Sequence, residues 1–187
     1  IYGTQMARAT YEGVKRFAYP KRPFIITRSA YSGAQRYTSS WTGDNVASWE
    51  HLWIANIQMQ RMSMSGMGFT GSDIGGFAEQ PSGELYARWI QLGVFHPFCR
   101  THSSVIDITR KFVELRYQLL PYLYTMFWQY VNEGVPMLKP LVYYDQDDFQ
   151  THYRTDEFIF GNQILVCPIL EPNALGRRMY LPKGNWY

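Results

Sequence analysis

Two spacings of apolar residues alternate along the first two thirds of the chain. Short apolar runs rich in β-branched and aromatic residues predict buried strands at 24–27, 37–41, 68–71 and 97–100. Apolar residues at helical spacing predict helices at 4–17, 46–64, 84–95 and 105–135. Thr4 and Ser48 are placed to cap the first two helices, and Pro121 is expected to break the last one.

The alternation of strand, polar strand end and helix predicts parallel βα units. Asp44, Asp73 and His102 follow one another at equal intervals of 29 residues, close to the roughly 30 residues that a βαβ unit requires. Arg28 precedes Asp44 by only 16 residues, so a loop or a single helical turn should join those two strands. Four units are half of a (β/α)8 barrel, in which the carboxyl ends of all strands meet on one face. We therefore expect Arg28, Asp44, Asp73 and His102 around one pocket.

The pattern changes beyond Gly134. Short strand-like runs separated by turn residues follow at 137–144, 157–160, 164–170 and 178–181. Such runs are typical of an antiparallel β-domain. We expect an α/β chain of two parts, with residues 1–135 as half of the barrel and residues 136–187 as the start of a β-domain packed on it.

Charge and hydropathy limit the classes of partner. The net charge of +3 comes from 18 basic and 15 acidic residues that are interspersed without a long block of either sign, which disfavours nucleic acid. No apolar run is long enough to span a bilayer and no signal-peptide plan opens the chain, so no membrane partner is expected. Because Ile1 begins what reads as an interior segment, the compartment stays open; the absence of Asn-x-Ser/Thr sites favours a bacterial source, cytoplasmic or periplasmic. The sequence does not indicate an oligomeric state.

Asp44 is the strongest candidate for chemistry. It follows an apolar strand in Trp41-Thr42-Gly43-Asp44-Asn45, and burial beside Trp41 would favour the protonated carboxyl that a general acid needs. Alternatively, Asp44 is only the N-cap of the next helix, and Asp73 has the same ambiguity within a glycine-rich loop. Arg28 could simply neutralise these acids, and His102 could be a satisfied polar residue at the barrel rim.

A metal site is not predicted. His51 and His152 have no partners at ligand spacing, and Asp145-Gln146-Asp147-Asp148 lacks the glycine and the closing glutamate of a calcium loop.

Several motifs in order resemble glycoside hydrolase family 31, and the resemblance runs nearly from end to end. Beside the Trp41 to Asn45 motif, they are Ile26-Thr27-Arg28-Ser29, Gly71-Ser72-Asp73-Ile74-Gly75-Gly76-Phe77, Arg88-Trp89-Ile90-Gln91-Leu92-Gly93, Pro97-Phe98-Cys99-Arg100-Thr101-His102, Leu119-Leu120-Pro121-Tyr122-Leu123-Tyr124 and Asp156-Glu157-Phe158-Ile159-Phe160-Gly161. The resemblance implies the C-terminal half of a (β/α)8 TIM barrel followed by part of an antiparallel β-sandwich domain. It also implies that the rest of the same polypeptide, an N-terminal β-domain and the first half of the barrel, is a partner of this segment.

The resemblance also implies roles for the candidate residues. Asp44 would be the acid/base, Arg28 and His102 would bind hydroxyls of the terminal sugar, and Asp73 would support the same subsite. Trp41 and Phe77 would form apolar walls, with no cofactor and an oligosaccharide as substrate. The implied activity is that of a retaining exo-acting α-glucosidase; α-xylosidase, α-glucosyltransferase and a non-catalytic carbohydrate-binding relative are the alternatives.

Two departures from the family pattern have consequences. The family nucleophile is an aspartate in a Trp-x-Asp-Met-Asn-Glu type motif, which this chain lacks, so we expect residues 1–187 alone to be inactive. Family members also carry a longer loop after the histidine, whereas Ser103-Ser104 here runs directly into Val105-Ile106. Residues missing from this sequence are preferred over a true deletion, because a deletion would remove one wall of the pocket.

Overall fold

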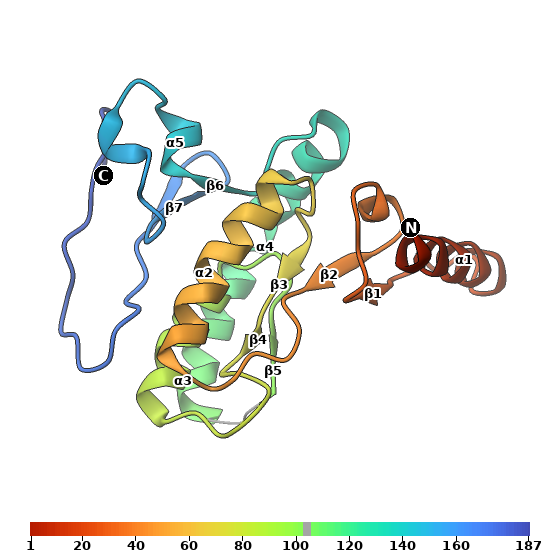
Figure 1. Cartoon of the computed structure of the whole chain (residues 1–187), viewed down its shortest axis with the longest axis horizontal. Coiled ribbons are helices and arrows are strands. Elements are labelled where there is room, and N and C mark those ends of the chain that lie inside the picture. Colours follow the sequence, from red (N-terminus) through yellow and green to blue (C-terminus); the bar gives the residue numbers. More distant parts are fainter. Residues whose placement is uncertain (103–105) are drawn as a thin grey trace.

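The computed structural model describes residues 1–102 and 106–187. Its elements in chain order are α1 (Tyr2–Phe17), β1 (Ile26–Thr27), η1 (Ala34–Arg36), β2 (Ser39–Trp41), α2 (Trp49–Met64), β3 (Thr70–Gly71), β4 (Asp73–Ile74), α3 (Gly83–Gly93), β5 (Arg100–Thr101), α4 (Ile106–Glu133), β6 (Leu138–Pro140), α5 (Leu141–Tyr144), η2 (Phe149–Thr151), β7 (Phe158–Phe160) and β8 (Ile164–Val166). The α1 end and the C-terminal segment lie at opposite ends of the long axis (Figure 1).

The strands of the first part are parallel and follow chain order. β1, β2 and β3 form one sheet, with Thr27 opposite Ser40 and Trp41 opposite Gly71. β4 pairs with β5, and the Phe98 N–H donates to the Thr70 carbonyl at 2.9 Å, which joins the segment before β5 to β3. This arrangement confirms the predicted parallel βα units, and the short η1 is the single helical turn expected between the first two strands.

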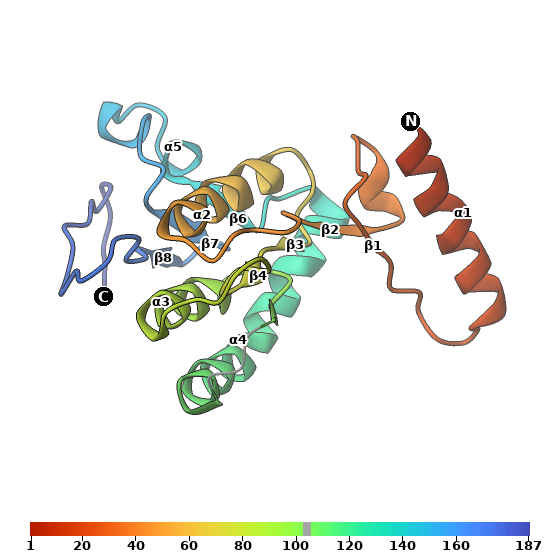
Figure 2. The same cartoon turned by 60° about the horizontal axis from the view of Figure 1, so that its bottom comes forward.

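Helices α2, α3 and α4 cover the sheet and share the main core. Large side chains at its centre, such as Trp89 and Tyr86 of α3 and Met59 of α2, are fully buried. Figure 2 shows the three helices side by side, with α1 standing apart beside β1. Ser48 caps α2 as predicted, since its hydroxyl accepts from the His51 N–H at 3.2 Å. The helix layer therefore fixes the ends of β2, β4 and β5 relative to each other.

The second part is a three-stranded antiparallel sheet in the order β6-β7-β8 that packs on α2. Buried amides of α2 reach across to it, because Asn56 Nδ2 and Gln60 Nε2 both donate to the Thr155 carbonyl, at 2.7 and 3.1 Å. Ser63 Oγ accepts from the Leu138 N–H at 2.9 Å. These polar contacts bind the second part to the same helix that follows Asp44.

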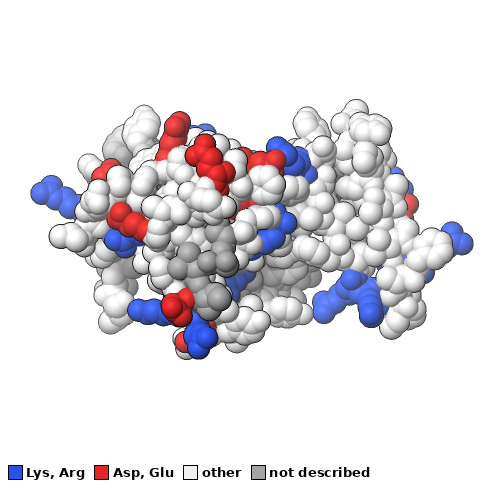
Figure 3. Space-filling view, turned by 90° about the horizontal axis from the view of Figure 1, so that it is seen from below, with Lys and Arg blue, Asp and Glu red and all other residues white. Residues whose placement is uncertain are grey.

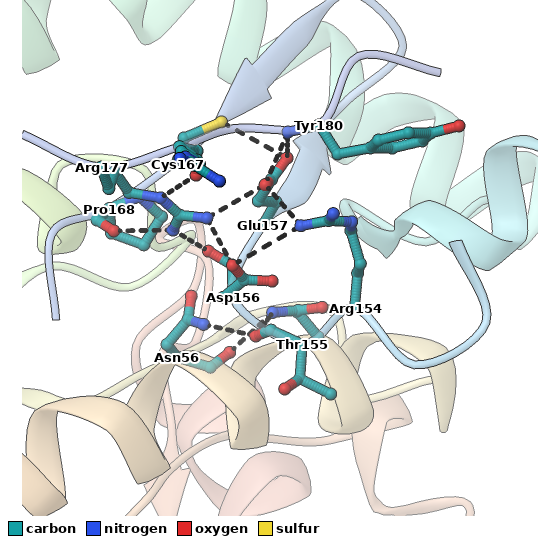
Figure 4. Close-up of polar contacts among 11 residues, drawn as sticks. Asn56, Arg154, Thr155, Asp156, Glu157, Cys167, Pro168, Arg177 and Tyr180 are labelled. Atoms are coloured by element: carbon teal, nitrogen blue, oxygen red, sulfur yellow. Dashed lines mark hydrogen bonds and ion pairs between the residues drawn. The ribbon is translucent and has the colours of Figure 1, made fainter. Parts of the chain in front are cut away.

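A buried ionic cluster holds the last segment of the chain against β7 (Figure 4). The Glu157 carboxylate is fully buried and pairs with Arg177 at 3.0 Å and Arg154 at 3.3 Å. It also accepts from the Tyr180 N–H at 2.9 Å, while Arg177 pairs with Asp156 and donates to the Pro168 carbonyl. These contacts, rather than the strand predicted at residues 178–181, hold that part of the chain in place.

Four local predictions were wrong. Thr4 does not cap α1, which begins two residues earlier after Ile1, and the Thr4 hydroxyl is buried without a partner among the described residues. Pro121 lies inside α4 without ending it, because one face of that helix is held along its length by the core. Residues 141–144 form the short helix α5 rather than a strand, and 178–181 form no strand.

The surface carries charges of both signs. On the face seen from below, basic and acidic side chains are dispersed among broad uncharged areas (Figure 3). Among the described residues, no helix combines the length and apolar character needed to cross a membrane.

Candidate functional site

Strand alternation decides which side chains face away from the helices. Thr70 Oγ1 lies 3.6 Å from Met62 Sδ of α2, and Trp89 Nε1 of α3 donates to Ser72 Oγ at 3.0 Å. Ile74 packs on Gly93 of α3 so closely that an added Cβ there would lie 2.4 Å from Ile74 Cδ1. Because successive strand residues point to opposite faces, Gly71 and Asp73 face the other side of the sheet.

The strand register extends this face to the neighbouring strands. Trp41 is the partner of Gly71, and Arg100 is the partner of Asp73. Arg28 follows Thr27, the partner of Ser40, so it comes level with Trp41, and His102 lies two residues beyond Arg100. The strand register thus places Arg28, Trp41, Asp73, Arg100 and His102 on one face of the strands.

Asp44 and Arg28 form an ion pair at the end of β2. Arg28 Nη1 donates to Asp44 Oδ2 at 3.2 Å, and 46 % of the Asp44 side chain and 58 % of the Arg28 side chain are exposed. The expected burial of Asp44 beside Trp41 is therefore wrong for this chain, because the Trp41 ring lies against two arginines instead. The alternative role as a helix cap also fails, since Ser48 caps α2.

Asp73 is the buried acid of the site. Its side chain is 1 % exposed, and its Oδ1 accepts from Arg100 Nη2 at 2.7 Å and lies 3.3 Å from His102 Nε2. Its Oδ2 is buried without a hydrogen-bond partner among the described residues. The His102 ring meets the half-exposed Phe77 ring edge to face, with centroids 5.1 Å apart. Asp73, His102 and Phe77 thus form one contact group.

Trp41 connects the Asp44–Arg28 ion pair to the group around Asp73. The guanidinium carbons of Arg28 and Arg100 lie 6.0 and 5.8 Å from the centroid of its ring, within cation–π range. The structure therefore connects all six candidate residues by a chain of pairwise contacts, in the order Asp44, Arg28, Trp41, Asp73, His102, Phe77, with Arg100 bridging Trp41 and Asp73. Whether these residues act as the resemblance implies stays a prediction.

Arg100 was not among the predicted site residues. It stands two positions before His102 in the same motif, so strand alternation alone would have placed both on one face. The signal was present, but the sequence offered no way to pair Arg100 with Asp73 in register before β4 and β5 were known to be neighbours.

A cavity of about 410 Å3 lies beside the site. It borders Arg28 and Trp41, and its other walls come from residues 30–32, from Ser40 and Thr42 and from residues 58–67 in and after α2, not from Asp44, Asp73 or His102. The predicted loop difference at Ser103 to Val105 lies outside the described residues. Within residues 1–102 and 106–187, no group of three or more His, Cys, Asp or Glu side chains is arranged to hold a metal ion.

Family models match nearly the whole chain. A family model described as the glycosyl hydrolases family 31 TIM-barrel domain matches residues 1–126, and one for the family 31 C-terminal domain matches residues 134–187. Alpha-glucosidase 2 of Bacillus thermoamyloliquefaciens is 41 % identical over the whole of this chain, which covers 25 % of that protein.

Solved structures of family 31 enzymes superimpose on nearly the whole chain. A family 31 α-glucosidase from Bacteroides thetaiotaomicron superimposes with a TM-score of 0.89 at 35 % identity, covering 99 % of this chain and 33 % of that one. A Flavobacterium johnsoniae dextranase of the same family, solved with glucose, also has a TM-score of 0.89, at 30 % identity over 98 % of this chain and 26 % of its own. The predicted fold class, half of a TIM barrel followed by part of a β-domain, is confirmed, and the boundary at residue 135 stays a prediction. The chain spans about a quarter of the length of the curated relative.

Proposed function

Because this chain belongs to glycoside hydrolase family 31, we propose that it is part of a retaining exo-acting α-glucosidase that removes terminal α-linked glucose from oligosaccharides. The observation that carries this proposal is the placement of Asp44. Its carboxylate stands at a strand end and is held by Arg28, which also contacts the Trp41 ring; Arg100 connects that ring to Asp73 and His102.

The roles of the residues follow from retaining chemistry. One carboxylate attacks the anomeric carbon, and a second one about 5 Å away protonates the leaving oxygen and then takes a proton from the attacking water. We assign the second role to Asp44, with Arg28 fixing the direction of its carboxylate. Arg28, His102 and Asp73 would hydrogen-bond the hydroxyls of the terminal glucose, and Trp41 and Phe77 would bound the ring. The nucleophile would come from outside residues 1–187.

The same proposal assigns a partner to an exposed face of α4. Val113, Leu120, Tyr117, Tyr124, Trp128 and Val131 lie on one side of this helix and are exposed. In a closed (β/α)8 barrel the last helix packs beside the first one. We propose that the remaining βα units of the same polypeptide cover this stripe and supply the nucleophile to the site.

Replacing the acid/base in the longer protein tests the proposal. Asp44→Asn should lower the hydrolysis of maltose about 10²- to 10⁴-fold, because the leaving oxygen loses its proton donor. An activated aryl α-glucoside needs little protonation, so its glycosyl-enzyme intermediate should still form. Added azide should then attack that intermediate, displace the enzyme carboxylate and give α-glucosyl azide with retained configuration.

The matched control is Asp147→Asn, which changes an exposed carboxylate in the segment Asp145-Gln146-Asp147-Asp148. It should leave the hydrolysis of maltose and of the aryl α-glucoside unchanged. Maltose hydrolysis at the wild-type rate by Asp44→Asn would overturn the assignment. An aryl α-xyloside and a sugar acceptor in the same assay distinguish glucosidase from xylosidase and transferase activity.

A further inference from the structure

We propose that Arg100 is a positioning residue of this site: through its ion pair with Asp73 and its contact with the Trp41 ring, it fixes Asp73, His102 and Trp41 relative to one another. The inference rests on the proposed function, since it concerns the same pocket. The register of β4 and β5 sets Arg100 directly opposite Asp73, on the face turned away from α3, against which Ile74 packs.

The burial of Asp73 requires a charged partner. An ionised carboxylate that is only 1 % exposed is costly unless it is paired and hydrogen-bonded. Arg100 is always protonated and donates to Oδ1 at 2.7 Å, whereas His102, 3.3 Å from the same oxygen, carries charge only when protonated. Arg100 is therefore the permanent cation that faces the buried Asp73 side chain.

Asp73 in turn orients His102. Its Oδ1 can accept a hydrogen bond from His102 Nε2, which defines the direction of the imidazole against the Phe77 ring. The other oxygen, Oδ2, is buried without a hydrogen-bond partner among the described residues, so the contacts of Oδ1 are the ones that set the orientation of the carboxyl group.

Arg100 also restrains Trp41. Its guanidinium carbon lies 5.8 Å from the Trp41 ring centroid and 5.7 Å from that of Phe98. The planar group can stack on both rings while it donates to Asp73, which an ammonium group cannot reproduce. Contacts thus run from Asp44 through Arg28, Trp41 and Arg100 to Asp73 and His102.

A double-mutant cycle in the longer protein separates this role from a merely structural one. Arg100→Met and Asp73→Asn should each lower kcat/KM for an aryl α-glucoside at least tenfold, and the double variant should be no worse than the poorer single one, because both act through one unit. Arg100→Lys should recover part of the loss. Arg110→Met, an exposed arginine on α4, is the control.

Thermal melting of the same variants reports on the pairing independently of turnover. Arg100→Met should lower Tm by several degrees, and adding Asp73→Asn should restore part of that loss, because the unpaired buried charge is then gone. Three results would each overturn the positioning role: losses of kcat/KM that add in the double variant, a wild-type kcat/KM in Arg100→Met, or a Tm of the double variant that does not recover. Failure of the wild type to cleave any α-glucoside would instead overturn the proposed function, whatever the melting cycle shows.

Discussion

Gly43 is the residue that lets Asp44 meet Arg28. Its φ is +84°, a conformation that residues with a Cβ rarely adopt, and an added Cβ would lie 3.0 Å from Arg28 Nη2. Gly43→Ala should therefore cost about 1 to 2 kcal/mol of stability through backbone strain. It should also lower the activity of the longer protein at least tenfold, because the ion pair is displaced. Thermal melting and maltose hydrolysis measure the two effects.

Gly13 provides the matched control for this change. It lies within α1 with nothing within 4 Å of an added Cβ and without a left-handed φ. Gly13→Ala should raise stability by about 0.5 to 1 kcal/mol and leave activity unchanged. Equal effects of the two substitutions would contradict the role assigned to Gly43.

His96 should make the fold sensitive to acid. It is fully buried, and Ser72 Oγ lies 3.4 Å from its Nδ1; burial, aided by the charge of Arg116, lowers the pKa of His96 from its ordinary value of 6.5 to about 3. Below pH 6.5 the unfolded chain binds a proton at this position that the folded chain does not. The contribution of His96 to stability is thus fully present above pH 6.5 and is lost as the pH falls toward 3. Over this range the unfolding equilibrium constant should rise about tenfold for each pH unit of acidification.

Denaturant unfolding between pH 6 and pH 4 checks this expectation. The wild type should lose stability more steeply than His96→Asn, by about one proton. Other titrating groups contribute equally to both curves, so the difference in slope isolates His96. Parallel curves would rule out a buried neutral imidazole.

At the level of helices and strands, the sequence predicts order and type better than ends. The two apolar spacings indicated the parallel strands and the helices between them, and the cap at Ser48 was readable from its position alone. The helix break predicted at Pro121 does not occur, because the packing of α4 on the core outweighs one missing backbone donor. Residues 141–144 have strand-like composition but follow β6 at Pro140, where the chain turns into α5.

The candidate site shows the same limit. Strand ends brought Arg28, Asp44, Asp73 and His102 together in outline, because all parallel strands end on one side. Partner choice could not be predicted. Arg28 pairs with Asp44 and Arg100 with Asp73, which depends on strand register, and the exposure of Asp44 depends on which residues cover it.

The cluster around Glu157 should be the main element that holds the C-terminal segment to β7. Glu157→Ala removes the buried one of the two carboxylates that Arg177 and Arg154 share, the other being Asp156, and it leaves the Tyr180 N–H without its acceptor, so we expect a loss of about 1 to 3 kcal/mol. Glu133→Ala, at the exposed end of α4, should cost little. Limited proteolysis should cut the segment after Pro168 first in Glu157→Ala, and an unchanged digestion pattern would argue against this role.

For the molecule as a whole, the decisive feature is that α4 is apolar on two opposite sides. One side, with Leu123 and Met126, is buried in the core. The opposite stripe carries Tyr117, Tyr124 and Trp128, which are 69, 67 and 55 % exposed. A helix of this kind is normally packed between two layers. An exposed apolar surface of this extent marks a contact face.

The stripe should therefore have opposite effects in two settings. In the longer protein, changing Tyr117, Tyr124 and Trp128 to Gln should lower stability by about 2 to 4 kcal/mol each, because the rings lose their burial against the other barrel units. In residues 1–187 alone, the same changes should reduce self-association and the binding of a hydrophobic dye, because there the rings face water. Glu114→Gln on α4 should change neither property. The contrary result is that the longer protein keeps its stability and the isolated chain keeps its self-association and dye binding. The stripe would then face solvent in both settings, and the barrel units outside this chain would close against another face.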